Sequence, residues 1–237
     1  MSNLGRRVPP DFDHVDKYRM SKLIVQTIDS VEDVLPLPPF RAFYDQGQEG
    51  SCVGFGWSWA MSILNREIGT RRFPKYDARW LYHRAQLADE WDDTPPEEGT
   101  SVRAGGDVLR DLGDVQISRG QPLSLDHANG ITANRWAVTV DEVRTGIALG
   151  IPVVVGVNWY SNFDRPETVG RDHWIGRGNL GGIRGGHCVC LYGASDRRQA
   201  VKITNNWGAS YPLVWLPYTT LQRLLDENGE AALITDR

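Results

Sequence analysis

Apolar positions in the first half of the chain repeat with the spacing of buried helices. A nearly continuous apolar run begins at Cys52 and predicts a helix that ends near Gly69. Asp77 precedes a second helical pattern, and Ser101 precedes a third that stops at Gly113. The first half is therefore predicted to be helical.

The second half changes to the shorter period of β-strands. The segment 139–142, Thr-Val-Asp-Glu, reads as a capping box that starts a helix reaching about Leu149. A run of β-branched residues at 152–157 comes next, as in a buried strand. Further strands are predicted at 187–193, 200–205, 213–216 and 231–235, with a short helix at 219–225. The sequence thus predicts an α+β protein with two lobes, one helical and one mostly antiparallel β.

The first 39 residues are punctuated by prolines and lack the strong apolar periodicity of the rest of the chain. Residues 1–39 are predicted to form an arm that packs along the body, and residues 40–237 to form the main domain. Within it, the helical lobe is expected at about 50–115 and the β-rich lobe at about 116–237. A cleft between two lobes is a common place for catalytic residues.

Composition narrows the class of protein. The 237 residues are 41% hydrophobic and 24% charged, as in an ordinary globular protein. The net charge of −4 gives no reason to expect a nucleic-acid or membrane partner. Three cysteines, with no close-set framework, argue against a disulfide-stapled secreted domain. We expect synthesis in a reducing cytoplasm, or association with a virion if the protein is phage-encoded, and no cofactor.

Cys52 stands where a thiol nucleophile would be useful. It opens a helix, whose N-terminus favours a negative charge and so a thiolate. Gln46, six residues earlier, could donate its side-chain amide to an oxyanion, with the Cys52 backbone amide as second donor. A lone buried cysteine and a turn glutamine are the ordinary interpretations of these residues taken singly. Their combination favours catalysis.

His187 is the best base among five histidines. It comes after two glycines and opens a predicted strand, so its ring can project into a cleft. His173 lies in a polar loop, where a solvated histidine is expected. The tract 187–190, His-Cys-Val-Cys, could suggest a metal site, but strand alternation would point Cys188 and Cys190 away from His187. We therefore predict no metal site.

Asn205 could orient the imidazole through the ring nitrogen that does not face sulfur. Asn206 could do the same if the strand ends one residue earlier, so both stay open. Trp207 could shield that hydrogen bond from water. Cys52 lies 135 residues before His187 and 153 before Asn205. Papain-type enzymes place these partners about 130–150 residues after the cysteine.

Together these segments resemble the papain-like C1 cysteine peptidases, especially cytoplasmic bacterial and phage members without a long prosegment. The matching segments are Gln46-Gly47 with Gly50-Ser51-Cys52, then 186–189, then 205–208. The resemblance implies that Cys52 is the nucleophile, His187 the general base and acid, Asn205 the orienting residue and Gln46 the oxyanion donor. It also implies substrate contacts at Gly99, Thr100, Gly186 and Trp207.

The chain departs from that family at several positions beside the motif. Glu49 stands where many secreted relatives have a disulfide cysteine, which agrees with a reducing compartment. Val53 replaces an aromatic residue after the nucleophile, and Asn206 replaces a serine. These changes affect the shape of the cleft rather than the reacting atoms.

Three functions are compatible with these residues. The first is a thiol peptidase that cleaves peptides or proteins through an acyl-enzyme. The second is a binding or structural protein on a papain-like scaffold, such as a phage particle component or an effector. The third is a cell-wall amidase of the related Cys-His type, which the spacing from Gln46 to Cys52 disfavours. An open cleft over Cys52 would favour an enzyme. An arm that fills the cleft would leave a binding or structural protein as an alternative.

Overall fold

The computed structural model describes residues 4–10, 19, 28, 30–38, 43–68, 70, 72–92, 98–126 and 129–236. Its helices are α2 (Cys52–Leu64), α3 (Ala78–Gln86), α4 (Val102–Asp111), α5 (Val140–Ala148) and α6 (Tyr218–Asp226), with short 3-10 helices at Ser161–Asp164 and Gly208–Ser210. Its strands are β1 (Glu32–Val34), β2 (Lys75–Tyr76), β3 (Asp114–Ser118), β4 (Gln121–Asp126), β5 (Ala133–Ala137), β6 (Val153–Tyr160), β7 (Glu167–Val169), β8 (Asp172–Trp174), β9 (Ile183–Ser195), β10 (Ala200–Thr204), β11 (Val214–Pro217) and β12 (Glu230–Asp236).

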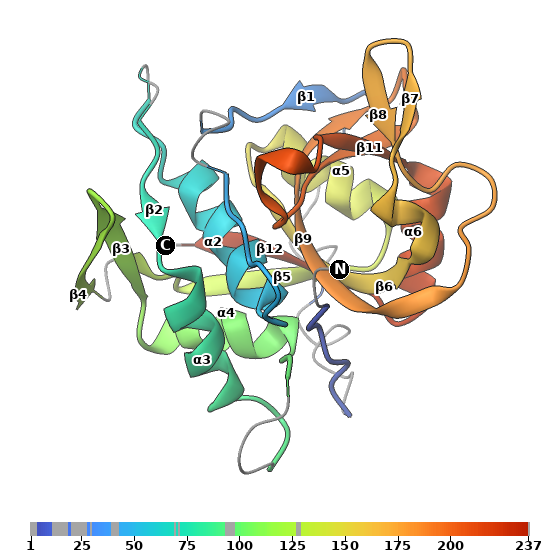
Figure 1. The fold of residues 1–237 in the computed structure, drawn as a ribbon. Helices are drawn as coiled ribbons and strands as arrows, with labels where there is room; N and C mark the ends of the chain where they lie inside the picture. Colours follow the sequence, from blue (N-terminus) through green and yellow to red (C-terminus); the bar gives the residue numbers. More distant parts are fainter. Residues whose placement is uncertain are drawn as a thin grey trace.

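Helix α2 lies in the middle of the molecule, between the other helices of the first half and the sheet (Figure 1). Its first twelve residues are all buried, because it packs against α3 on one side and β9 on the other. Gly56 allows the close approach to β9: a Cβ there would lie 2.7 Å from Sγ of Cys188. The apolar run that predicted this helix is thus an inner helix covered on all sides.

Side-chain N-caps stabilise the starts of three helices, and the one at Thr139 was predicted from the sequence. Asp77 accepts a hydrogen bond from the amide of Trp80, and Ser101 accepts one from Ala104. Thr139 forms a full capping box with Glu142 at the start of α5. Helix α2 ends at Leu64, not near Gly69, because the chain emerges there into solvent and burial no longer supports the helix.

The β half contains one large sheet. Among the described residues its order is β5-β12-β6-β9-β10-β11-β8-β7, with β1 added beside β9. All of its pairings are antiparallel except that of β8 with β11, which is parallel and departs from the expected antiparallel lobe. Helices α5 and α6 lie on the same side of the molecule as this sheet, away from α3 and α4 (Figure 1).

Strand β9 separates two apolar cores. Cys188 and Cys190 belong to the core around α2, whereas Val189 and Leu191 belong to the core of the β half. This is the alternation expected from the sequence, and it turns both cysteines toward the helical lobe. The structure is therefore the predicted α+β fold with two lobes, and β9 forms part of the wall between them.

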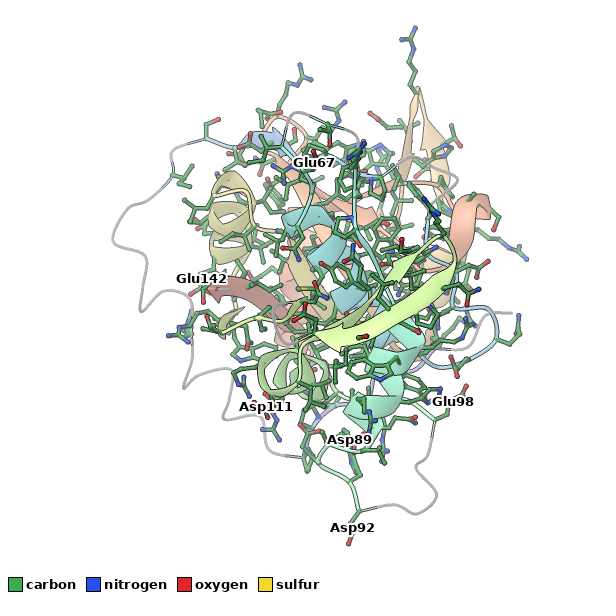
Figure 2. All side chains as sticks on the ribbon, turned by 90° about the vertical axis from the view of Figure 1, so that its left-hand side faces the viewer. Glu67, Asp89, Asp92, Glu98, Asp111 and Glu142 are labelled. Carbon is green, nitrogen blue, oxygen red and sulfur yellow. The ribbon has the colours of Figure 1, made fainter. Side chains whose placement is uncertain are left out.

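Sequence reasoning overlooked the small sheet β2-β3-β4, onto which Figure 2 looks directly. Its β3–β4 turn places Arg119 and Gly120 at positive φ, as in a tight hairpin turn. The expected boundary at residue 39 lies outside the described residues, so the division into arm and main domain stays a prediction. In the described residues, no helix is long and apolar enough to cross a membrane.

Candidate active site

Cys52 is the first residue of α2 and is fully buried. Its Sγ accepts a hydrogen bond from the backbone amide of Cys188, 3.3 Å away. Cys188 is the residue directly after His187 on β9, so the sulfur lies against the strand that carries the predicted base. The structure thus places the Cys52 sulfur against the residue next to His187, 136 positions away in the sequence.

The His187 ring is held by Asn205. Nε2 lies 2.9 Å from Oδ1 of Asn205, and the same Oδ1 accepts a hydrogen bond of 2.7 Å from the Asn206 amide. The bond from the Asn206 amide identifies this atom as the carboxamide oxygen, which can only accept, so Nε2 must carry the proton and donate it. Nδ1 is then the basic nitrogen, and it has no hydrogen-bond partner among the described residues.

Two tryptophans enclose the His187 ring. Trp207 stacks on it with 5.1 Å between ring centroids and 29° between planes, and Trp159 meets it edge-on at 4.7 Å. These rings exclude water from the bond between His187 and Asn205, which strengthens that bond electrostatically. Trp207 therefore lies where the sequence expected a shield.

Asn206 occupies a position that sequence reasoning left open as an alternative to Asn205. Its Nδ2 donates to the carbonyl oxygens of Cys52, at 3.3 Å, and Cys188, at 2.7 Å. It therefore ties the start of α2 to β9 and fixes the distance between the two walls. The adjacent pair thus divides two tasks: Asn205 contacts the imidazole and Asn206 contacts the backbone.

Gln46 is buried beside this cluster. Its backbone amide donates to the carbonyl of Asn206 at 2.8 Å, so its backbone is anchored to the same segment that carries Asn205. Its Nε2 donates to the Glu49 carbonyl at 2.8 Å. One of the two hydrogens of Nε2 is therefore engaged within the loop before Cys52, which holds the carboxamide in place.

The remaining described histidines lie apart from the cluster. His83 approaches the Glu49 carboxylate at 3.5 Å, and Arg79 approaches it at 3.1 Å. These contacts tie the loop before Cys52 to α3. His173 lies 3.2 Å from the Thr168 hydroxyl in the β7–β8 hairpin. His14 and His127 lie outside the described residues.

Residues 4–10, here called the N-terminal segment, run between the two lobes (Figure 1). The Arg6 amide donates to the Gly186 carbonyl at 3.1 Å. On the facing wall, the Thr100 amide donates to the Gly5 carbonyl at 2.9 Å, and the Arg7 amide donates to the Thr100 carbonyl at 2.8 Å. The positions expected to hold substrate backbone therefore hold the chain's own backbone.

The N-terminal segment covers the sulfur closely. A Cβ on Gly5 would lie 1.6 Å from the carbonyl oxygen of Gly50, so only glycine fits at this point. Across the cleft, a Cβ on Gly186 would lie 2.1 Å from the Arg6 carbonyl oxygen, and one on Gly99 would lie 2.5 Å from the Gly5 carbonyl oxygen. The segment is thus fitted into a narrow channel lined by glycines.

Burial keeps both Cys52 and His187 neutral in this state. It raises the pKa of the Cys52 thiol to about 12, although hydrogen bonds from the amides of Cys188 and Gly5 oppose the shift. Burial likewise lowers the pKa of His187 to about 4, against the opposing effect of the Asn205 hydrogen bond. Desolvation disfavours the charged form of each group. The covered cleft therefore contains a thiol and a neutral imidazole at pH 7.

The other titratable residues around the cleft have structural contacts in the described part of the chain. Within the described part of the chain, no group of three or more His, Cys, Asp or Glu residues could hold a metal ion. Cys188 and Cys190 are buried and unpaired in the core around α2. Asp89 and Glu98 lie near the end of α3 (Figure 2), where they accept hydrogen bonds from Thr100 and Gly50 and so brace the channel.

Solved structures resemble this one over its whole length. Xylellain, a cysteine protease from Xylella fastidiosa, matches with a TM-score of 0.66 and 18% identity over 100% of this chain and 97% of its own. A procathepsin B from Trypanosoma congolense matches with a TM-score of 0.61 and 12% identity over 99% and 86%. A recombinant stem bromelain precursor matches with a TM-score of 0.58 and 13% identity over 98% and 77%.

No protein-family model matches the chain, and no curated protein matches it. The structural similarities span both lobes and share the arrangement of helices and sheet that brings Cys52 to β9. At these identities they identify the architecture alone. The chain has the papain-like fold.

Proposed function

We propose that this protein is a thiol peptidase that hydrolyses peptide bonds and is held inactive by its own N-terminal segment. One observation carries the proposal: Asn205 holds Nε2 of His187 while the Cys52 sulfur rests on the amide of the next residue, Cys188. Nδ1 of His187 is buried without a partner among the described residues, which costs about 1–3 kcal/mol. A purely structural protein would be more stable if that nitrogen had a hydrogen-bond partner.

The chemistry depends on which nitrogen carries the proton. With Nε2–H donated to Asn205, Nδ1 of His187 can take the thiol proton while Sγ of Cys52 attacks the peptide carbonyl carbon. The imidazolium then gives this proton to the leaving amine as the carbon–nitrogen bond breaks, which leaves a thioester. Water attacks the thioester, its proton passes to Nδ1, and the acid product and free thiol are released.

The carbonyl oxygen carries the negative charge in both steps. The backbone amide of Cys52 and Nε2 of Gln46 are the donors proposed for it, and Gln46 is anchored to Asn206 by its backbone. Removing one such donor typically lowers kcat by about 10²–10³. In the covered state Nε2 of Gln46 donates to the Glu49 carbonyl, which holds the carboxamide in place.

The covered cleft bears on the second function considered from the sequence, a binding or structural protein. The N-terminal segment fills the channel over Cys52, as expected if the protein binds rather than cleaves. An intact pair of Cys52 and His187 beneath that cover is better explained by a latent enzyme. Two of the similar structures are also precursor forms by name, a procathepsin and a bromelain precursor.

The test uses the full chain with the cover displaced. Gly5→Val would place a Cβ in the space of the Gly50 carbonyl oxygen, so the segment cannot keep its position. We expect this variant to cleave a mixed peptide library faster than the unaltered chain. Adding Cys52→Ala or His187→Ala should abolish cleavage and should abolish labelling by a thiol-reactive epoxide.

A matched control is Cys190→Ala, which removes a buried cysteine from the core around α2 but not from the site. It should leave cleavage by the Gly5→Val variant nearly unchanged. Cleavage that survives Cys52→Ala would overturn the proposal. A Gly5→Val variant that folds and labels at Cys52 but cleaves no peptide would instead favour the binding protein, or the amidase if it releases cell-wall fragments.

The cellular setting of this peptidase is part of the proposal. Cys52, Cys188 and Cys190 are all free, as expected in a reducing compartment. We propose peptide or protein substrates and synthesis in a cytoplasm, with virion association if the gene belongs to a phage.

A further inference from the structure

Cys188 brings a second thiol next to the proposed nucleophile. Its backbone amide donates to Sγ of Cys52 at 3.3 Å. Its own side chain faces α2, the helix that Cys52 begins, because a Cβ on Gly56, one helical turn after Cys52, would lie 2.7 Å from Sγ of Cys188. Both thiols are completely buried and neither is part of a disulfide. The two walls of the site therefore each contribute a free thiol.

The two cysteines are close enough to be joined. An amide hydrogen points away from its own Cα, so the hydrogen-bonded sulfur of Cys52 lies about 4 Å from Cα of Cys188. The Cα atoms of the two cysteines are then no more than about 7 Å apart, which is the limit for a disulfide. Asn206 holds this separation, since its Nδ2 donates to the carbonyls of both cysteines. A bond between the sulfurs therefore needs rotation of the side chains but no separation of the walls.

The third cysteine, Cys190, has a different environment. It faces the same core as Cys188 but lies two residues further along β9, and its Sγ donates to the Leu191 carbonyl at 3.6 Å. Its backbone amide makes no contact with the Cys52 sulfur among the contacts of the described residues, whereas that of Cys188 does. Cys188 is therefore the thiol placed to react with an oxidised Cys52.

The two thiols differ in reactivity. An oxidant reacts with a thiolate far more readily than with a thiol. Burial raises the pKa of the Cys188 thiol well above its ordinary value, and the neighbouring Cys52 adds to the shift. Cys52 is also a thiol while it is covered, but it stands at a helix N-terminus, which favours a negative charge once the N-terminal segment leaves. Cys52 is thus the group that meets the oxidant, and Cys188 the group that resolves the product.

We propose that Cys52 and Cys188 form a redox modification site, at which a hydroperoxide oxidises Cys52 and Cys188 closes a reversible disulfide with it. The Cys52 thiolate attacks one peroxide oxygen, the oxygen–oxygen bond breaks, and hydroxide or alkoxide departs, leaving a sulfenic acid. Sγ of Cys188 then attacks the sulfenic sulfur. The sulfur–sulfur bond forms as the sulfur–oxygen bond breaks, and the hydroxide leaves as water with the thiol proton of Cys188. The two thiols together lose two electrons, which reduce the peroxide.

The disulfide would remove the nucleophile without destroying it. Sulfinic and sulfonic acids are not reduced by thiols, whereas a disulfide is, so Cys188 protects Cys52 from permanent loss. Disulfides of proteins in a reducing compartment are usually transient and sense oxidants. Modification at this site is additional to the proposed peptidase function, because it depends on the two thiols and not on the bond that is hydrolysed.

The experiment uses the full chain carrying Gly5→Val, in which the sulfur is uncovered, treated with a slight excess of hydrogen peroxide. Free thiols are then alkylated in denaturant without reductant, and the digested chain is analysed by mass spectrometry. We expect the number of alkylated cysteines to fall from three to one, with the peptides of Cys52 and Cys188 joined and lighter by the two thiol hydrogens. Dithiothreitol should separate the peptides and return all three thiols.

Cys190→Ala is the matched control, because it removes the other buried cysteine of the same strand face. It should keep the joined peptides, whereas Cys188→Ala should lose them. With more peroxide, Cys188→Ala should instead carry a sulfinic or sulfonic acid at Cys52 that dithiothreitol does not reverse. Joined peptides that survive Cys188→Ala would overturn the inference, as would oxidation of Cys52 that leaves Cys188 fully alkylated in the parent variant.

The mass measurement does not depend on peptide cleavage. If the disulfide forms and the reduced chain cleaves no peptide, the modification site stands and the proposed function fails. If peptides are cleaved but no disulfide forms, the proposed function stands and the site is wrong. Arg6→Gln, which loosens the same segment, replaces Gly5→Val if that variant does not fold, and the same two outcomes apply to it.

Discussion

The two ends of the covered channel differ in the ionisation state of their buried side chains. Around Cys52 and His187, burial keeps both side chains neutral, and the N-terminal segment contributes to the burial of Cys52. A residue away, Arg6 and Glu230 are equally buried yet face each other as an ion pair. At the first end, desolvation suppresses ionisation of the side chains. At the second, the attraction between opposite charges stabilises the buried pair. The difference indicates how one short segment can both bind tightly and suppress a nucleophile.

This division assigns separate tasks to neighbouring residues of the segment. Gly5 contributes no side chain and allows the backbone to approach the sulfur, whereas Arg6 contributes the buried charge. Changing Arg6 should loosen the segment, and changing the reacting groups should alter how the protein responds to pH. Substitutions at either end of the channel can therefore test this comparison.

The largest expected effect comes from Arg6→Gln. Removing one partner of a buried ion pair costs about 3–5 kcal/mol, because the other charge is left uncompensated. Without the guanidinium the segment should leave the channel more readily, so limited proteolysis should cut within residues 4–10 far faster. Urea unfolding should report the lost stability.

Arg7→Gln is the control from the same segment. Arg7 lies over the ring of Trp91, 3.9 Å from its centroid, a contact worth about 0.5–1 kcal/mol at partly exposed sites. Equal losses in the two variants would show that the buried ion pair does not anchor the segment.

A slightly smaller loss of folding stability is expected when the pH falls far enough to protonate His187. The unfolded chain takes up a proton on this histidine as the pH falls below 6.5, whereas the folded chain does so only near pH 4. Stability should therefore fall by about 3 kcal/mol between pH 7 and pH 4, since each unit is worth 1.36 kcal/mol. Urea titrations at several pH values measure this slope.

His187→Gln should remove that part of the slope, while His173→Gln, in the partly exposed β7–β8 hairpin, should leave it in place. If both variants lose the same part of the dependence of stability on pH, burial of His187 is not the cause of that dependence.

The smallest effect is expected for Asn206→Ala. Its side chain donates to the carbonyls of Cys52 and Cys188, and leaving buried acceptors unsatisfied costs about 1–3 kcal/mol. Ser210→Ala, which removes an exposed hydrogen bond to the Trp207 carbonyl, should cost less than about 0.5 kcal/mol. Unfolding in urea that gave the two variants equal stability would argue against Asn206 as a tie between the walls.

Local patterns predicted much of this molecule because local physics determines it. Asp77, Ser101 and Thr139 start helices through bonds to residues three positions later, so their signals are visible in the sequence. The β3–β4 hairpin was missed because β4 is exposed along its whole length, and its turn depends on Arg119 adopting a positive φ.

Contacts between distant residues were beyond such reasoning. The spacing of Gln46, Cys52 and His187 indicated a shared site, yet it did not reveal that Nε2 of Gln46 donates to Glu49. Nothing near Arg6 in the sequence points to Glu230, because their pairing depends on β12 lying beside β6. The covering of Cys52 by residues 4–10 likewise arises only in the folded chain.

The central claim is that the N-terminal segment silences Cys52 by desolvating it. The direct measurement is the rate of Cys52 alkylation by iodoacetamide as a function of pH, in the full chain and in Gly5→Val, with Cys52→Ala as background. A thiol of pKa about 12 is about 10⁻⁵ ionised at pH 7. We predict that Gly5→Val reacts at least about 100-fold faster at pH 7, with a midpoint at or below the ordinary thiol value of about 8.5. Equal rates and equal midpoints in the two chains would contradict the claim.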